Sequence, residues 1–344
     1  MVECHERKKG LTMKKIRVAI NGFGRIGRLV LRAAIESGRK DIEFVAINDV
    51  TPLEENAHLL EYDSVHGKLN THVKTDGDYI LVGGHKIKCL CERDPSKLPW
   101  KKLRIDVVME CTGLFTSADK ARVHLDNGAK RVLVSAPSVG ADKTIVFGVN
   151  ENKITRKDLI ISNASCTTNC LAPVLNVLDK KFGIKSGWMT TVHAYTGDQQ
   201  LLDKNHKDFR RARAANLSMI PTTTGAAKAI GLVLPKLDGK LDGVAIRVPT
   251  PDVSVIELVL NLDKKTTVEK VNQAMMSAQS DILAYNEKPL VSIDFTHDAH
   301  SVIFDGSFTR VVDGDVLHVT AWYDNEWGFS NRMCDTAIAI GKTL

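Results

Sequence analysis

The stretch NGFGRIG at residues 21–27 decides the fold of the first half of the chain. It follows a predicted strand and opens a predicted helix, which is the context that a GxGxxG pattern needs in a dinucleotide-binding βαβ unit. Gly22 then forms the tight turn, Gly24 lets a pyrophosphate approach the backbone, and Gly27 lets the helix pack on the strand. The free N–H groups at the helix N-terminus would face the anion.

Asp49 stands at the end of the next predicted strand, about 20 residues after the last glycine of the motif. A carboxylate there accepts hydrogen bonds from the ribose hydroxyls of NAD and repels the 2′-phosphate of NADP. The alternative is a glycine-rich turn with a strand-terminal Asp that acts as a cap. Because strand, loop, helix and Asp occur together, the sequence predicts NAD as the cofactor.

Short apolar runs alternate with helical patterns through the first half of the chain. We expect helices at 26–37 and 117–127 and strands at 16–20, 44–47, 105–110, 131–134, 144–149 and 159–161. Alternating strands and helices are typical of a parallel sheet. The predicted fold class is therefore α/β, with a Rossmann domain over 14–164 behind a polar tail at 1–13.

The pattern changes near residues 162–165. Strand-like runs at 253–262, 301–303 and 316–322 have connections too short for crossover helices, and helical periodicity returns at 267–282 and 330–340. We expect an α+β catalytic domain with a mostly antiparallel sheet over 165–328. The segment 209–226 has no clear period, and long irregular segments inside compact domains are usually functional.

Composition excludes several classes of protein. The chain has 344 residues, of which 43% are hydrophobic, and no uncharged apolar stretch approaches the roughly 18 residues of a membrane span. The net charge is +6, but most of the excess lies in the first 17 residues, so nucleic acid is not expected as the primary partner. The seven cysteines are irregularly spaced without a CxxC pair, which predicts no structural metal site and a reducing compartment.

Cys166 is the candidate nucleophile, in the stretch SNASCTTNC at 162–170. Ser165 is a natural N-cap for a helix that runs to about Phe182, so Cys166 falls in the first turn, where the helix dipole favours the thiolate. Cys170 lies one turn deeper, and Pro173 predicts a kink or a late start of the helix. The alternative is two buried structural cysteines.

His193 ends the apolar run at 188–193 and is the candidate base for that thiol. The alternative is a core or surface histidine without a catalytic role. Candidate anion contacts near segment junctions are Ser165, Thr167, Thr196, Thr222–Thr224, Gly225, Arg211 and Arg247. Thr224 and Gly225 precede a predicted helix whose N-terminus could hold an anion, and the alternative for each contact is ordinary capping or surface charge.

Seven segments together resemble the phosphorylating glyceraldehyde-3-phosphate dehydrogenase family, and the likeness is collinear from about residue 14 to 344. SCTTNC and WYDNEWG are the most specific motifs. The segments are residues 21–27, 162–170, 193–196, 210–213, 220–228, 247–250 and 322–332.

The resemblance implies a role for each site residue. Cys166 is the nucleophile and His193 its base. The implied cofactor contacts are Gly22, Gly24 and Gly27 in the loop, Arg25 and Ile26 at the phosphates, Asp49 at the ribose, Arg93 and Ser135 along the site and Asn325 at the nicotinamide. The implied phosphate contacts are Thr196 and Arg247 for the substrate, and Ser165, Thr167, Thr224 and Gly225 for inorganic phosphate, with Arg211 as a further contact.

The resemblance also implies a reaction, the oxidation of D-glyceraldehyde 3-phosphate to 1,3-bisphosphoglycerate with NAD and inorganic phosphate through a cysteine thioester. It implies a cytoplasmic homotetramer of glycolysis and gluconeogenesis, without a metal, in which the C-terminal helix at 329–344 packs back on the Rossmann domain. One alternative is erythrose-4-phosphate dehydrogenase. A second is a semialdehyde or acyl-phosphate reductase, but the motif SCTTNC followed by HAYTGD does not suit that class. A third is an adhesin or RNA-binding protein, which only the basic tail supports.

Overall fold

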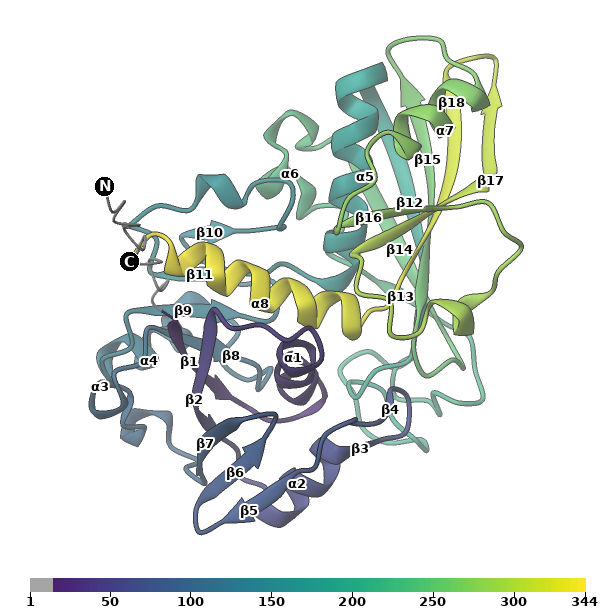
Figure 1. Cartoon of the computed structure of the whole chain (residues 1–344). Helices are drawn as coiled ribbons and strands as arrows, with labels where there is room; N and C mark the ends of the chain where they lie inside the picture. Colours follow the sequence, from purple (N-terminus) through teal and green to yellow (C-terminus); the bar gives the residue numbers. More distant parts are fainter. Residues whose placement is uncertain (1–14) are drawn as a thin grey trace, which may run out of the picture.

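The computed structural model describes residues 15–344, so the predicted tail at 1–13 lies outside the described residues. Two sheets organise the chain, a nine-stranded sheet in the first half and a seven-stranded sheet in the second. Figure 1 shows the two sheets in separate halves of the molecule, with the last helix lying across the first sheet's half. Among the helices of residues 15–344, none is long and apolar enough to cross a membrane.

The nine-stranded sheet is built around β1 (Ile16–Asn21), which pairs in parallel with β2 (Ile42–Asn48) on one side and with β8 (Val107–Glu110) on the other. The strand order is β10-β11-β9-β8-β1-β2-β7-β6-β5. The remaining strands are β5 (Lys74–Asp76), β6 (Tyr79–Val82), β7 (His85–Leu90), β9 (Arg131–Val134), β10 (Lys143–Thr144) and β11 (Ile160–Ser162). The helices are α1 (Arg25–Glu36), α2 (Leu53–Glu61), α3 (Trp100–Leu103) and α4 (Ala118–Asp126), and a hairpin of β3 (Tyr62–Asp63) and β4 (Gly67–Lys68) stands apart.

The predicted Rossmann arrangement is confirmed in its parallel core, and two details differ. The strand expected at 144–149 is only β10, because the chain turns back after Thr144. Asn150 closes that turn, with its Oδ1 accepting from the N–H of Val146 and its Nδ2 donating to the carbonyl of Thr144. The antiparallel pairs β5–β6 and β6–β7 were not predicted, because these strands are short and both β5 and β7 carry charged residues.

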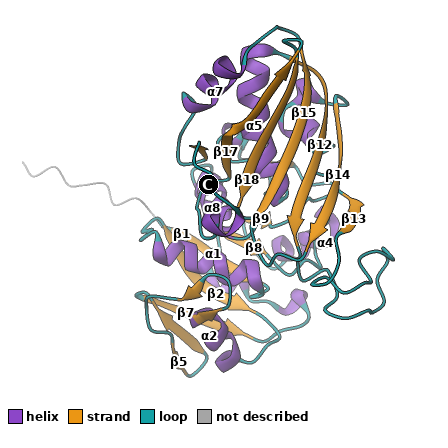
Figure 2. Cartoon of the chain, turned by 90° about the vertical axis from the view of Figure 1, so that its right-hand side faces the viewer, coloured by secondary structure: helices purple, strands orange, loops and turns teal. Residues whose placement is uncertain are grey.

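The seven-stranded sheet has the order β13-β14-β12-β15-β18-β17-β16. Four of its six pairings are antiparallel, which confirms the predicted character of the second half. Its strands are β12 (Ile184–Ala194), β13 (Ile220–Thr223), β14 (Leu241–Val248), β15 (Ser254–Leu262), β16 (Leu283–Asn286), β17 (Val302–Val312) and β18 (Val316–Tyr323), and its helices are α5 (Cys166–Phe182), α6 (Ile230–Val233) and α7 (Val268–Met276). Figures 1 and 2 show α5 and α7 on one face of this sheet.

Helix α5 begins at Cys166 and continues through Pro173 to Phe182, so the expected late start is wrong. Proline costs an interior helical hydrogen bond. Here the ring of Pro173 is buried with nine other residues of the helix, several of which join the large apolar core against the sheet. This burial stabilises the helix more than the missing bond weakens it.

The last helix, α8 (Trp327–Gly341), completes the core of the nine-stranded sheet. Its apolar residues Phe329, Met333, Cys334, Ala337 and Ile340 belong to the same buried cluster as the side chains of β1 and α1. The Cys334 thiol also donates to the carbonyl of Val30 at 3.5 Å. The first and last elements of the described chain therefore share one hydrophobic core.

The glycine loop has the tight packing that its motif requires. Gly22 has a φ of +90°, a conformation that favours glycine. A Cβ on Gly27 would lie 2.1 Å from the carbonyl oxygen of Gly22, a distance too short for any side chain. A Cβ on Gly24 would meet nothing within 4 Å. The open space beside Gly24 lies on the side of the cavity described below.

We expect Gly27→Ala to lower the free energy of unfolding by about 1–3 kcal/mol, because the new methyl group must displace the backbone of the loop. Gly24→Ala is the matched control, since its methyl group points into open space and should change stability by less than about 0.5 kcal/mol. Urea unfolding of both variants measures the difference. Equal stabilities would show that the loop does not hold α1 against β1 as described.

Candidate active site

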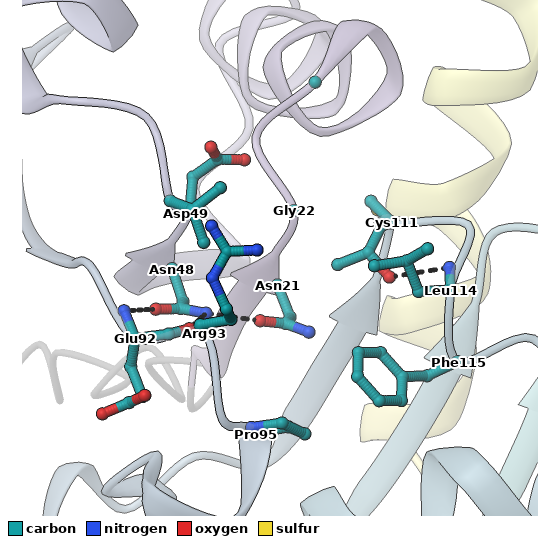
Figure 3. Close-up of a pocket in the computed structure, with 13 residues that line it drawn as sticks. Asn21, Gly22, Asn48, Asp49, Glu92, Arg93, Pro95, Cys111, Leu114 and Phe115 are labelled. Carbon is teal, nitrogen blue, oxygen red and sulfur yellow. Dashed lines mark hydrogen bonds between the residues drawn. The ribbon is translucent and has the colours of Figure 1, made fainter.

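A cavity of about 280 Å³ opens at the carboxyl ends of β1, β2 and β8. Because strand order reverses between β8 and β2 around β1, this is the switch point at which open α/β sheets bind ligands. Figure 3 shows the side chains around it. The lining residues are Asn21, Gly22, Gly24, Asn48, Asp49, Val50, Glu92, Arg93, Pro95, Cys111, Thr112, Leu114 and Phe115.

Asp49 is anchored to the glycine loop. Its Oδ2 accepts a hydrogen bond from the N–H of Phe23 at 2.6 Å, and its Oδ1 accepts from the N–H of Thr51 at 2.9 Å. Each carboxylate oxygen keeps a further lone pair, so Asp49 can also accept from hydroxyl groups in the cavity. Its negative charge at this position fits a ribose and opposes a 2′-phosphate.

Buried hydrogen bonds hold the floor of this cavity. Asn48 Nδ2 donates to Asn21 Oδ1 at 2.8 Å, and Asn21 Nδ2 donates to Glu110 Oε2 at 2.7 Å. His124 contacts the same oxygen at 2.9 Å, and its Nδ1 accepts from the indole N–H of Trp100 at 3.1 Å. The indole can only donate, which places the histidine proton on Nε2. The floor is therefore rigid and fully specified before any ligand binds.

The predicted cofactor residues fall into two groups. Gly22, Gly24, Asp49 and Arg93 line the cavity itself. Arg25, Ile26 and Gly27 form the first turn of α1, Ser135 follows β9, and Asn325 follows β18 in the other half of the chain. The guanidinium of Arg25 pairs with Glu326 and Asp63, and Arg25 is not among the residues that line the cavity. An open glycine cradle, a helix N-terminus and a ribose-binding carboxylate together fit an NAD molecule.

Cys166 is the first residue of α5, as predicted. The Ser165 side chain caps the helix by accepting from the N–H of Thr168 at 3.1 Å, which confirms the predicted N-cap. Cys166 packs against both the core of the first sheet and the core of the second. The reactive sulfur is therefore fixed at the junction of the two halves.

His193, near the end of β12, faces that sulfur. Its Nε2 lies 3.5 Å from Cys166 Sγ, and its Nδ1 lies 2.7 Å from the carbonyl oxygen of Ala194. Nδ1 also lies 3.1 Å from an Nη of Arg247, which can only donate, but the contact with the carbonyl oxygen is shorter. The shorter contact favours the ring proton on Nδ1, with a lone pair on Nε2 toward the thiol. Burial, with the positive charge of Arg247, lowers the pKa of His193 to about 3, so the imidazole is neutral at physiological pH.

Opposing influences act on the Cys166 thiol. Burial raises its pKa, while the Arg247 guanidinium, the Thr167 hydroxyl and the N–H groups of residues 166 and 167 favour the thiolate. The expectation from the helix N-terminus alone was a thiolate. The structure instead gives a half-buried thiol that is held beside a neutral base, with donors already placed to stabilise the anion once the proton moves.

Arg247, from β14, completes the group around Cys166. One of its Nη atoms lies 3.0 Å from the Ala194 carbonyl and 3.4 Å from the Thr196 hydroxyl. Its Nε is buried and donates to no residue within 15–344. An arginine with a free buried donor beside a hydroxyl is well suited to bind a phosphate.

Asn325 reaches the same site through Ser254. The Ser254 hydroxyl donates to Asn325 Oδ1 at 2.7 Å and accepts from the N–H of Ala194 at 3.0 Å. Since Oδ1 accepts that bond, the amide nitrogen of Asn325 is left to donate elsewhere. This arrangement links the predicted nicotinamide contact to the residue that follows His193.

Other predicted anion contacts are occupied or more distant. The buried Thr167 hydroxyl is 2.9 Å from the hydroxyl of Tyr323, and the Arg211 guanidinium donates to Asp198 and Thr222. Arg211 still acts on His193 through its charge. Thr224 and Gly225 do not precede a helix as expected, because a turn follows them and α6 starts only at Ile230.

Sequence reasoning missed several residues of the site. Asn48, Glu92, Thr112 and Phe115 line the cavity, and Tyr323 packs edge-on against His193 with ring centroids 5.9 Å apart. Asn48 directly precedes Asp49 at the end of a strand, which was an available signal. The others come from loops whose approach depends on tertiary packing.

Comparison with known proteins agrees with this geometry. The family model described as "Glyceraldehyde 3-phosphate dehydrogenase, NAD binding domain" matches residues 16–118, and the one described as "Glyceraldehyde 3-phosphate dehydrogenase, C-terminal domain" matches residues 165–325. The first match confirms the predicted NAD-binding half.

Curated relatives match over nearly their whole length. Glyceraldehyde-3-phosphate dehydrogenase of Xanthobacter flavus is 60% identical over 95% of this chain and 99% of its own. Those of Cereibacter sphaeroides and Pseudomonas aeruginosa are 59% and 53% identical, over 96% and 94% of this chain and 99% and 98% of their own. The chain therefore belongs to the glyceraldehyde-3-phosphate dehydrogenase family.

Proposed function

We propose that this chain oxidises D-glyceraldehyde 3-phosphate with NAD and inorganic phosphate to give 1,3-bisphosphoglycerate. The observation that carries the proposal is the Cys166 thiol, 3.5 Å from the neutral Nε2 of His193 and beside the free guanidinium donor of Arg247. A nucleophile, a base and a phosphate contact thus stand together where two halves of the chain meet.

His193 starts the chemistry by accepting the thiol proton. The neutral Nε2 takes the proton from Sγ, and the N–H groups of residues 166 and 167 with Arg247 stabilise the thiolate that forms. The sulfur then attacks the aldehyde carbon, and the new oxyanion lies close to the Cys166 N–H and to the protonated His193. The protonated His193 returns its proton to this oxygen, which gives the hemithioacetal and leaves the imidazole neutral for the next step.

Oxidation converts the hemithioacetal to a thioester on Cys166. His193 removes the hydroxyl proton while the hydride leaves the same carbon. NAD supplies the hydride acceptor when it is bound. Asn325, fixed by Ser254, would orient the nicotinamide amide, and Asp49 would hold the ribose at the far end of the site.

Inorganic phosphate then attacks the thioester, and the Cys166 thiolate leaves. Thr196 and Arg247 would hold the phosphate of the substrate, and Ser165, Thr167, Thr224 and Gly225 with Arg211 would contact the attacking phosphate. Binding two anions near one carbon requires fixed cationic and N–H donors, because the anions repel each other. Arg247 supports this role best, since its Nε has no other acceptor among residues 15–344.

We extend the proposal to the organisation of the chain. The NAD-binding domain would span 14–164 and the catalytic domain 165–328, with residues 329–344 returning to the first domain. A homotetramer in the cytoplasm is the expected assembly. Support for association comes from large apolar side chains exposed between β12 and β13, Leu201, Leu202, Phe209, Leu217 and Met219.

Cys166→Ser should lower phosphate-dependent NAD reduction by at least about 10³-fold, because the hydroxyl is a much poorer nucleophile. Cys170→Ala is the matched control. Its thiol is buried in the core one turn along α5, and its pKa is raised well above the usual value, so this variant should keep most of the activity. Stopped-flow absorbance of NADH measures both variants, and activity that survives in Cys166→Ser would refute the assignment.

Substrate identity is tested by kcat/KM for glyceraldehyde 3-phosphate and erythrose 4-phosphate, each with and without inorganic phosphate. We expect the triose phosphate to be favoured and NADH production to stall after one turnover without phosphate, because the thioester then persists. Preference for the tetrose phosphate would contradict the proposed substrate while leaving the thioester chemistry intact.

Arg247→Met should slow alkylation of Cys166 by iodoacetamide at pH 7 by roughly tenfold, because loss of a neighbouring positive charge raises the thiol pKa. The pH at which alkylation reaches half its maximal rate should move upward. Arg213→Met is the control, since Arg213 pairs with Asp203 on the surface. An unchanged pH profile in Arg247→Met would show that this charge does not act on the sulfur.

Asp49→Asn should reduce the preference for NAD over NADP by at least about tenfold, because it removes a charge that repels the 2′-phosphate. The amide oxygen can keep only one of the two backbone contacts of Asp49, so the variant's stability is measured beside its kinetics. The ratio of kcat/KM values for the two cofactors is the measurement. If that ratio does not change, Asp49 does not select the cofactor.

A further inference from the structure

Three buried side chains meet where the β3–β4 hairpin touches the second half of the chain. His66 comes from the hairpin, Asp252 precedes β15 and Asp324 follows β18. One ligand atom from each lies within 4.8 Å of the other two. The His66 side chain is fully buried and that of Asp252 is 1% exposed. None of the three belongs to the cofactor cavity or to the group around Cys166.

Asp252 has no hydrogen-bond donor for its charge. The N–H of Val253 is near enough to favour the ionised form, but neither carboxylate oxygen accepts a hydrogen bond from a residue in 15–344. The arginine that reaches this region cannot help, because Arg25 is engaged by Glu326 and Asp63. An ionised carboxylate buried without a partner is costly, so its oxygens need a cation or a proton.

We propose that His66, Asp252 and Asp324 form a binding site for a divalent metal ion of the zinc class, with three protein ligands and a fourth position left for water. Imidazole and carboxylate ligands together suit this class. The two aspartates supply two negative charges that pair with no lysine or arginine of the described chain, and a dication balances them.

The distances allow one small cation. His66 Nε2 lies 3.8 Å from Asp252 Oδ2, and the ligand atoms of all three residues lie within 4.8 Å of one another. With metal–ligand bonds of about 2.0–2.2 Å, tetrahedral ligand atoms lie about 3.3–3.6 Å apart. The three side chains would therefore move together by up to roughly an ångström when the ion binds. Calcium would need more oxygen ligands and longer bonds.

The surroundings orient these ligands as in known metal centres. Asp324 Oδ2 accepts from the N–H of His297 at 2.7 Å, and its Oδ1 accepts from the N–H groups of Glu326 and Trp327. His66 Nδ1 lies 3.1 Å from His297 Nδ1, which fixes the ring with Nε2 toward the cluster. Ligands that are themselves hydrogen-bonded are the rule in metal sites.

A shared proton is the competing occupant. Burial and the nearby carboxylates of Asp324 and Glu326 raise the pKa of Asp252 far above its usual range. A neutral Asp252 could then donate to Asp324 without any metal. The two occupants differ in a measurable way, because only a metal ion adds a stoichiometric atom and a ligand-field spectrum to the protein.

The test uses full-length Cys166→Ser protein, which removes the thiol that would otherwise bind soft metals beside His193. After treatment with a chelator, Co²⁺ is titrated as a spectroscopic probe and Zn²⁺ is added in competition. We expect one equivalent of Co²⁺ with the visible ligand-field bands of a tetrahedral site and no sulfur-to-cobalt charge-transfer band. Zn²⁺ should abolish these bands.

Asp252→Asn and His66→Gln should each lower Zn²⁺ affinity by at least about 100-fold, since loss of an outer partner alone costs 10–100-fold. The amide introduced by Asp252→Asn can donate to Asp324, so this variant keeps the fold without the charge. His300→Gln is the matched control, because His300 pairs with Asp298 in a half-exposed contact away from the cluster. It should bind Zn²⁺ as tightly as its parent.

Three results would overturn the proposal. The first is no stoichiometric Co²⁺ or Zn²⁺ in the parent protein. The second is binding that survives in both Asp252→Asn and His66→Gln. The third is a pH-dependent melting temperature that Asp252→Asn abolishes while added Zn²⁺ has no effect, which would assign a proton to the cluster. None of these readouts depends on dehydrogenase activity, so they are independent of the proposed function.

Discussion

The start of helix α5 is the constraint on which both halves of the molecule depend. Asn163 is fully buried, with its N–H donating to β9 at Val134 and its Oδ1 accepting from Thr336 of α8. The next residue, Ala164, has a φ of +57°, which costs roughly 1–2 kcal/mol in a residue with a Cβ. The fixed Asn163 on one side and the capped helix on the other maintain that strain. The backbone at Cys166 therefore cannot shift without breaking buried hydrogen bonds to β9 and α8.

Much of the fold could be predicted because its signals are local. The glycine motif, the strands of the parallel core and the Ser165 cap each depend on neighbours along the chain. The elements that were not predicted depend instead on contacts between residues that are not neighbours in the sequence pattern. Strands β5 and β7 are short and carry charged residues, and the run at 144–149 reads as a strand but is folded back by Asn150, whose contacts no periodicity reveals. Helix α5 tolerates Pro173 because ten of its residues are buried, and burial is a tertiary property.

The candidate site was predictable in its residues and less so in its electrostatics. Cys166, His193, Thr196 and Arg247 do come together; the residues alone suggested His193 as the base for Cys166, and the resemblance placed Thr196 and Arg247 at the same substrate. The helix N-terminus suggested a thiolate, and the structure shows that burial opposes this. The cluster of His66, Asp252 and Asp324 carried no sequence signal, since its members lie far apart in the chain and share no motif spacing. Such a cluster becomes visible only when the strand ends are placed in space.

The way α8 completes the first core has a consequence for synthesis. Chains are made from the N-terminus, and domains usually fold as they emerge from the ribosome. Here β1 and α1 are finished early, yet Phe329, Met333 and Ile340 of their core arrive last. Until then the first sheet exposes the apolar surface that α8 will cover. The nascent chain therefore carries an incomplete first domain through nearly its whole translation.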